Sequence, residues 1–307
     1  MTEFRHTPEC FAAHMGIYAC EPHWMREAVA HIKAGRAPSR RAATTDPGAP
    51  LFMVRADGIA VVPISGPMFK GFSKYSEANT IAIRQAVREA AASADVKGIL
   101  LAIDSPGGTV AGTSDLADEV AQAGIIKPVH AYIEDFGASA AYWVASQAGR
   151  ITANPTAEVG SIGTLAVVED TSGAAQMAGV VVHVISTGPY KGAFVDGAPV
   201  TPEHLADLQR RIDALNVHFL DGVARGRRMT TDTVQALADG RMHIASQAQQ
   251  LGLIDAVGPL ESAVSALRAQ IDLRAAAQNS RESQDSQGAV SRRRRAAALI
   301  SITELGG

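Results

Sequence analysis

The sequence predicts an α/β fold with a mainly parallel β-sheet, and three observations support this prediction. From Leu51 onward, short apolar runs rich in β-branched residues alternate with segments of helical spacing. The segments between successive runs are long enough for crossover helices, which parallel strands require. The 307 residues are 47% hydrophobic and 19% charged, a composition typical of a globular chain with a substantial core.

The apolar runs are the predicted strands. They span residues 59–64, 98–103, 129–133, 150–153 and 180–185. The last run belongs to one of the longest apolar stretches, Gly179–Ile185. This stretch suits a buried strand better than a membrane span, which needs about 18 apolar residues.

Helical spacing is found before, between and after these strands. The predicted helices span residues 22–34, 76–92, 113–122, 138–148, 202–225, 231–237 and 260–271. Thr113 or Ser114 is expected to cap the third of these helices, because threonine and serine are favoured at that position.

Composition divides the chain into three parts. Residues 1–50 are expected to be irregular, forming an N-terminal arm and a breaker-rich linker, and residues 51–272 form the main domain. Residues 273–307 are predicted to be a flexible polar linker and a basic C-terminal tail that contains Arg292–Arg295. This tail is expected either to dock on an acidic protein surface or to be solvated.

Charge and motifs exclude several partners. A net charge of −3 gives no electrostatic footprint for nucleic acid. We expect no membrane contact and a cytoplasmic location, because no secretory signal or long apolar run is present. Cys10 and Cys20 are expected to be reduced thiols. Neither a zinc-binding spacing nor a phosphate-binding loop indicates a cofactor, so none is expected.

Ser139 and Lys191 are the first pair of residues that suggests chemistry. Ser139 lies among glycine and alanine at a predicted strand-to-helix junction, and Lys191 follows 52 positions later in a predicted turn. A serine in such a place can be a nucleophile activated by an amine, provided that burial keeps the lysine neutral. The alternatives are that Ser139 only caps a helix and that Lys191 is a solvated surface residue.

Two further turns could complete such a site. Gly107 and Gly108 follow the strand at 98–103, where bare backbone amides could form half of an oxyanion hole. Ser161 lies in a second small-residue turn and could hold the lysine amine. Each of these turns alone could equally be an ordinary connection.

A serine–histidine–aspartate arrangement is the commoner solution among hydrolases, so the histidines downstream of Ser139 were considered. They are His183, His204, His218 and His243. None of them lies in a Gly/Asp-rich turn, so each is expected to be a surface or core residue.

Taken together, four segments resemble peptidase family S49. They are Asp104–Gly108, Gly137–Trp143, Ala153–Gly163 and Gly188–Lys191, and the resemblance covers roughly residues 55–265. It implies a Clp protease/crotonase-like fold with repeated ββα units. It also implies Ser139 as nucleophile and Lys191 as general base, with Ser161 steadying the lysine. The oxyanion hole would be formed by Gly108, with Gly107, and by the amide of Ala140.

The resemblance also suggests a biological role. In this family, single-domain subunits can form homo-oligomeric rings in which the lysine reaches across from a neighbour. The absence of a predicted anchor and the opening of the domain at residues 60–67 favour the phage branch. We therefore hypothesise a phage or prophage head-maturation endopeptidase acting on scaffold, portal or coat proteins. The alternatives are a cytosolic signal-peptide-peptidase-like protease of general peptide turnover, a non-catalytic capsid assembly protein and, last, an acyl-CoA enzyme of the crotonase type.

Overall fold

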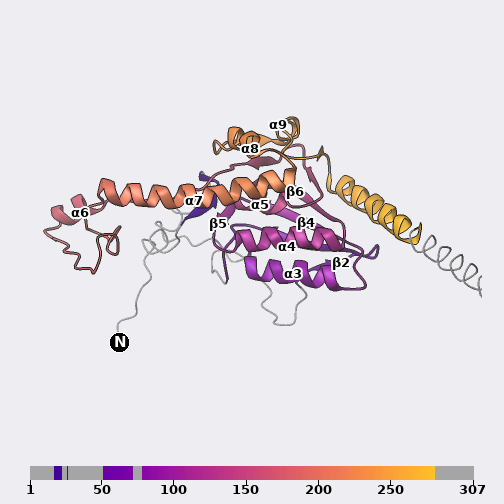
Figure 1. Cartoon of the computed structure of the whole chain (residues 1–307), viewed down its shortest axis with the longest axis horizontal. Helices are drawn as coiled ribbons and strands as arrows, with labels where there is room; N and C mark the ends of the chain where they lie inside the picture. The colour runs from indigo at the N-terminus through magenta and orange to yellow at the C-terminus, as the bar shows by residue number, and fades with distance from the viewer. Residues whose placement is uncertain (1–16, 23–25, 27–50, 72–77, 281–307) are drawn as a thin grey trace, which may run out of the picture.

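The computed structural model describes residues 17–22, 26, 51–71 and 78–280 (Figure 1). Its main sheet has the strand order β10-β7-β6-β4-β3-β2. The strands of this path are β2 (Met53–Val54), β3 (Ile59–Ser65), β4 (Gly98–Ser105), β6 (Val129–Ala138), β7 (Arg150–Ala153) and β10 (Ala256–Val257). All neighbouring pairs from β10 to β3 are parallel, and only β2 pairs antiparallel. The α/β fold with a mainly parallel sheet is therefore confirmed.

Helices cover both faces of this sheet. On one face lie α3 (Thr80–Ala92), α4 (Thr113–Ile126) and α5 (Ala140–Ala145), as Figure 1 shows. The helix at residues 260–280 covers the other face. Successive side chains of β4 point to opposite faces of the sheet. Leu101 packs into the core on one face, and Leu100 packs with Leu267 in the core on the other face.

The remaining elements lie outside this strand path; two of them are further strands of the same sheet, and two form a separate two-stranded sheet. These elements are β1 (Tyr18–Cys20), β5 (Gly107–Thr109), β8 (Glu158–Gly160), α6 (Ser172–Met177), α7 (Pro202–Arg227), α8 (Thr231–Leu237), β9 (Met242–Ile244) and α9 (Ala245–Gln250). α7 crosses the molecule, and its N-terminal end carries a lobe that projects away from the sheet (Figure 1). We call residues 167–200 the projecting lobe; it contains α6. None of the helices in the described ranges combines the length and apolar character needed to cross a bilayer.

Most predicted elements are present, and four predictions are wrong. The flexible linker predicted from residue 273 starts too early, because residues 273–280 continue the helix that begins at 260. Residues 180–185 form no strand and are largely exposed, because they lie in the projecting lobe instead of beside the sheet. The arm predicted to be irregular contains β1, which is ordered by pairing with β5. The cap of α4 is Gly112, in a left-handed conformation, because Thr113 already lies inside the helix and donates its hydroxyl to the Thr109 carbonyl. Most of the predicted helix 22–34 and the Arg292–Arg295 run lie outside the described residues.

Candidate active site

Ser139 lies at the sharp turn between β6 and α5. Its backbone has φ 53° and ψ −119°, a conformation that is costly for a residue with a side chain. Its hydroxyl makes no capping hydrogen bond to α5. The alternative in which Ser139 serves only as a helix cap therefore has no support in the geometry. A serine on a strained strand-to-helix turn is typical of hydrolase nucleophiles.

Backbone contacts bring Ser161 next to this turn. Ala138 pairs with Gly160 at the end of the β6–β8 ladder, and the Ser139 amide donates to the Gly160 carbonyl over 2.7 Å. Ser161 follows at once and also has a positive φ of 49°. Two of the four positive-φ residues other than glycine in the described chain are thus these two serines. Because such strain concentrates at functional sites, this turn is the best candidate site of the molecule.

The first turn of α5 contributes unpaired amides beside Ser139. The first intrahelical hydrogen bond joins the Trp143 amide to the Ser139 carbonyl over 2.9 Å, so the amides of Ala140 and Ala141 precede the helical ladder. The positive end of the helix dipole lies at the same point. An anionic oxygen would be favoured in this position.

Gly107 brings a second backbone segment close to these amides. Its φ is 94°, and a Cβ at this position would lie 3.0 Å from the Ala140 nitrogen. The Gly107 amide donates to the Ser105 hydroxyl over 3.2 Å, and Ser105 in turn donates to the Gly66 carbonyl over 2.7 Å. Gly107 therefore lies against the start of α5.

No hydrogen bond joins Lys191 to Ser139 in the described part of the chain, where the partner of the Ser139 hydroxyl is the Gly163 carbonyl. The Lys191 side chain is exposed in the projecting lobe, which contacts the N-terminal end of α7 through a 3.3 Å hydrogen bond between His204 and the Pro189 carbonyl. The part of α7 that touches α5 is Phe219, whose ring stacks on Trp143 at 4.9 Å. Nearer the lobe, the Ile212 carbonyl of α7 accepts from Thr164, which follows the Gly163 carbonyl that contacts Ser139. His204 and Ile212 are eight positions apart on one helix, about 12 Å at 1.5 Å per residue.

The alternative histidines do not complete a triad either. His183 is exposed in the lobe, and His218 is exposed on α7. His243 lies in β9 opposite Val159, and a Cβ on Gly160 would lie 3.2 Å from its ring. In the described part of the chain, no hydrogen bond joins any of these rings to the Ser139 hydroxyl, whose recorded partner is the Gly163 carbonyl at 3.5 Å.

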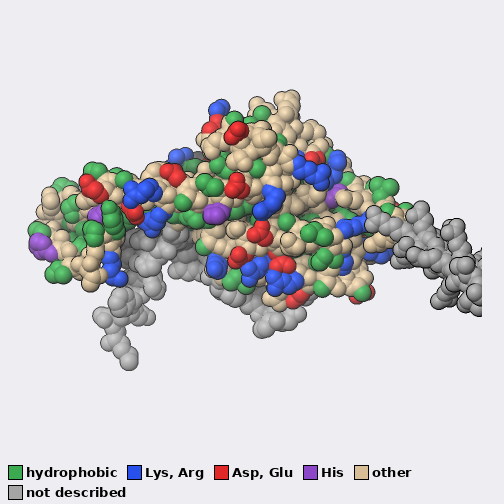
Figure 2. Space-filling view, in the orientation of Figure 1, with side chains coloured by type: hydrophobic (Ala, Val, Ile, Leu, Met, Phe, Trp, Pro, Cys, Tyr) green, Lys and Arg blue, Asp and Glu red, His purple; other side chains and the backbone are tan. Residues whose placement is uncertain are grey.

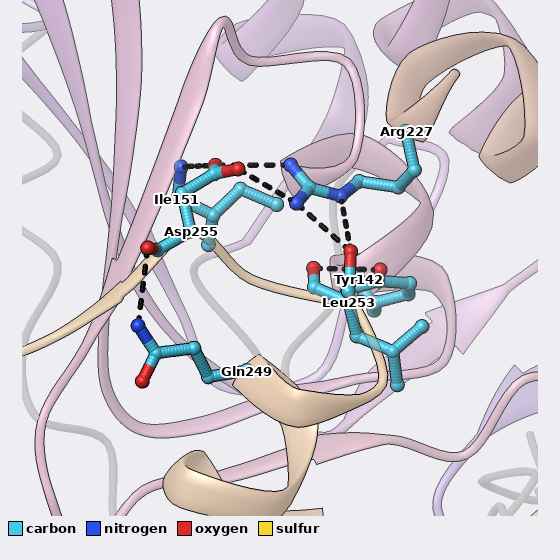
Figure 3. A network of polar contacts seen from close by, with 7 residues as sticks. Tyr142, Ile151, Arg227, Gln249, Leu253 and Asp255 are labelled. Carbon is cyan, nitrogen blue, oxygen red and sulfur yellow. Dashed lines mark hydrogen bonds and ion pairs between the residues drawn. The ribbon is translucent and has the colours of Figure 1, made fainter. Parts of the chain in front are cut away.

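A polar network fixes the position of α5 (Figure 3). The Tyr142 hydroxyl donates to the Leu253 carbonyl over 2.8 Å. Arg227 donates to the Gly252 carbonyl and forms a 2.9 Å ion pair with Asp255, which also accepts from the Ile151 amide over 2.7 Å. Burial opposes ionisation of Asp255, but the hydrogen bonds from Arg227 and Ile151 outweigh it and lower its pKa. The network ties α5, α7 and β7 together.

Two glycines let α7 approach α5 closely. A Cβ on Gly222 would lie 2.2 Å from the indole nitrogen of Trp143, and one on Gly226 would lie 2.1 Å from the Ser146 carbonyl oxygen. The Gln147 side chain bridges the same contact by donating to the Gly222 carbonyl over 2.8 Å. These contacts with α7 therefore hold in place the helix that follows Ser139.

Sequence reasoning missed one part of the site. β1 lies between β5 and Leu165, pairing with β5 on one side and bridging to Leu165 on the other. A three-residue strand preceded and followed by irregular sequence carries too little periodicity to be predicted. Only pairing with distant segments orders it.

Comparison with known proteins identifies the family of this chain. A serine on such a strand-to-helix turn of an α/β fold is typical of hydrolases. The profile of peptidase family S49 matches residues 121–274, and the chain belongs to this family of peptidases.

Several known proteins are similar to this chain. A putative protease of Methanocaldococcus jannaschii is 35% identical over 172 residues, which cover 56% of this chain and 55% of the relative. The capsid assembly protease C of Escherichia phage lambda is 35% identical over 231 residues, covering 71% of this chain and 50% of that protein. A putative signal peptide peptidase of Enterococcus faecium is 30% identical over 174 residues, covering 56% and 51%. The matches thus span about half the length of these relatives.

Proposed function

We propose that this peptidase is a serine endopeptidase that uses a Ser/Lys dyad. The observation that carries the proposal is the strained turn of Ser139, which lies against unpaired helix amides and next to Ser161. The Ser139 hydroxyl attacks a peptide carbonyl, and Lys191 takes its proton. The amides of Gly108 and Ala140 stabilise the oxyanion, since the Gly107 amide is engaged by Ser105. The C–N bond then breaks as the lysine returns its proton to the leaving amine, and water hydrolyses the resulting acyl-enzyme to free Ser139.

We also propose that Lys191 acts on the Ser139 of a neighbouring copy. Two observations support this: the length of α7 between the lobe and α5, and the apolar surface of the lobe. Val181, Ile185 and Met177 are 71%, 97% and 88% exposed, and Figure 2 shows hydrophobic side chains on this lobe. Such residues are expected to be covered in an assembly. A homo-oligomer would bury them and bring in the missing amine.

The biological role that we favour is phage or prophage head maturation. The match to the lambda capsid assembly protease, 35% identical over 231 residues, supports this role. Substrates would be scaffold, portal or coat proteins. A protease of general peptide turnover is the second candidate, favoured by the archaeal and Enterococcus relatives. Terminase, portal and coat genes beside this gene would support the first role, and their absence would favour the second.

A serine-directed fluorophosphonate tests the chemistry. We expect it to label the assembled protein at Ser139 and to block hydrolysis of a denatured protein substrate. Ser139→Ala should abolish both labelling and hydrolysis. Ser246→Ala is the matched control, because Ser246 is exposed on α9 far along the chain from the turn. Equal hydrolysis by Ser139→Ala and the wild type would refute the proposal, and would favour a non-serine peptidase.

A further inference from the structure

β1 lies in the candidate active site as an added strand. Tyr18, Ala19 and Cys20 pair antiparallel with Thr109, Gly108 and Gly107. On its other side, Tyr18 exchanges two 2.8 Å hydrogen bonds with Leu165. The segment is thus held between two backbone edges, which is how proteins bind an extended peptide by β-strand addition.

The hydrogen bonds alternate between the two edges along the segment. The Ile17 carbonyl accepts from the Val110 amide over 3.2 Å, and the Glu21 amide donates to the Pro106 carbonyl over 2.8 Å. Tyr18, between them, bonds to the opposite edge. This alternation is the pattern of an extended strand, and it fixes which residue faces the turn of Ser139.

Ala19 is the residue that reaches the candidate oxyanion amides. Its carbonyl oxygen lies 2.3 Å from the position that a Gly107 Cβ would occupy, and the Ala140 nitrogen lies 3.0 Å from the same position. Ala19 is also in register with Gly108. The Ala19 carbonyl therefore lies beside Gly107 and Gly108, on the side of Gly107 that also faces the Ala140 nitrogen.

Both the nucleophile and the segment are enclosed. Ser139 has no exposed surface, and neither has Ala19, while Cys20 is 2% exposed. A nucleophile that acts on proteins must be reached from solvent, so the arrangement describes an occupied cleft.

We propose that residues 17–21 are a built-in occupant of the peptide-binding cleft, an autoinhibitory segment with Ala19 in the place of the residue whose carbonyl is attacked. The proposal rests on the proposed function of Ser139 and adds its regulation and a preference. A substrate must displace the segment, which lowers its apparent affinity by the fraction of molecules in which the cleft is free. Because the Ala19 side chain is fully enclosed, the substrate residue before the cleaved bond is expected to be small.

Cys20 reports whether the cleft is occupied. The chain has two cysteines, so Cys10→Ser leaves Cys20 as the sole thiol, and Ser139→Ala in the same chain makes the assay independent of proteolysis. Burial, reinforced by the charge of Glu21, raises the pKa of Cys20 to about 12, so the bound segment carries little thiolate. We expect a maleimide to modify Cys20 at least about tenfold more slowly in the folded than in the denatured protein. Equal rates would overturn the proposal.

Ala19→Arg tests the register. An arginine cannot fit the enclosed position, so the segment should leave and Cys20 should react at least about tenfold faster in the folded protein. Ala94→Arg is the matched control, since Ala94 is exposed in the turn after α3, and it should leave the rate unchanged. A thermal melt of both variants separates release of the segment from unfolding. An unchanged Cys20 rate in a folded Ala19→Arg protein counts against the proposal.

A competing peptide gives a second measurement without any change in the cleft. A synthetic peptide with the sequence of residues 16–22, with serine for Cys20, should accelerate Cys20 modification in proportion to its occupancy. A scrambled peptide should not. Failure of the matching peptide at concentrations that inhibit hydrolysis would contradict the assignment.

Measurements of hydrolysis distinguish the proposed inhibition by residues 17–21 from the proposed proteolytic function of Ser139. With Ser139 restored, Ala19→Arg should raise kcat/KM for a peptide substrate at least about tenfold, because the internal competitor is removed. Protected Cys20 in a protein that hydrolyses nothing would support the occupied cleft and refute the proteolytic function. Active protein with an unprotected Cys20 would do the reverse.

Discussion

The Ser139 amide donates a 2.7 Å hydrogen bond to the Gly160 carbonyl, so β8 fixes the backbone of the candidate nucleophile directly. Because Ser161 follows Gly160, the same contact places a second hydroxyl beside the turn. Ser161 is buried, and its own amide is held by the Arg241 carbonyl over 2.8 Å. The position of both serines thus depends on one short strand.

Ser161→Ala should reduce turnover while preserving the fold. We expect kcat to fall by about 10- to 100-fold, the effect of about 1–3 kcal/mol from one lost hydrogen bond to the lysine. KM should change little. Steady-state kinetics beside Ser246→Ala, with a thermal melt of each, would check this. Unchanged kcat would remove Ser161 from the site.

Mixing two inactive variants should restore activity if Lys191 acts on a neighbour. Ser139→Ala retains the lysine and Lys191→Ala retains the serine. In a mixed head-to-tail ring, about one quarter of the sites combine an intact serine with an intact lysine. Hydrolysis by the equimolar mixture, compared with each variant alone, measures this. Should the mixture stay as inactive as its components, the lysine acts within its own chain or not at all.

The apolar surface of the projecting lobe should be needed for assembly. Ile185→Arg replaces a side chain that is 97% exposed, so the fold of the single chain should be unaffected. We expect weaker self-association by analytical ultracentrifugation and a parallel loss of activity, because a buried charge is costly in an interface. Leu273→Arg is the control, since Leu273 is 72% exposed on the helix at 260–280. Normal assembly of Ile185→Arg would place the interface elsewhere.

The close approach of α7 to α5 should make Gly226 irreplaceable. In Gly226→Ala the new methyl group meets the Ser146 carbonyl, and we expect a loss of about 1–3 kcal/mol in unfolding free energy. Gly124→Ala in α4 meets no atom within 4 Å, and should instead gain up to about 1 kcal/mol from helix propensity. Urea denaturation of both variants gives the comparison. Stabilisation in both would mean that the two helices separate without cost.

The Arg227–Asp255 pair should contribute stability that depends on pH. Asp255→Asn leaves the largely buried Arg227 unpaired, and we expect a loss of about 3 kcal/mol at pH 7. The lowered pKa of Asp255 means that its contribution is present above the unfolded value of about 3.9 and fades as the pH falls below it.

The difference in Tm between the wild type and Asp255→Asn should therefore narrow below about pH 4. Asp118→Asn is the control, because it removes a surface pair with Arg225 in which both side chains are about 60% exposed. Its cost should stay below about 1 kcal/mol at any pH. Equal losses of stability for the two variants would show that the Arg227–Asp255 pair contributes no more than a surface pair.

The sequence alone was sufficient to predict the strands that consist of continuous apolar runs. The predicted strands at 59–64, 98–103, 129–133 and 150–153 are present, because continuous apolar runs have only the sheet interior to occupy. The family and the α/β class were predictable from the four glycine- and serine-containing turns. These turns also carry local backbone requirements that a sequence displays directly.

Two features could not be predicted, for different reasons. Residues 180–185 have the composition of a strand, but strand formation also requires a neighbouring edge, and composition does not reveal which edge is within reach. The position of Lys191 depends on the length and direction of α7, which local patterns do not determine. The proposed roles of Lys191, Ser161 and the amides of Gly108 and Ala140 accordingly remain predictions for the experiments above.

α7 sets a distance as well as a contact. Its 26 residues measure about 39 Å, and one end is locked to Trp143 while the other carries the lobe. A rigid helix of this length sets the distance between Trp143 and the lobe. Inserting four residues would move the lobe about 6 Å outward and turn it by about 40°. The spacing between active centres in any assembly built through the lobe is therefore encoded in the residue count of a single helix.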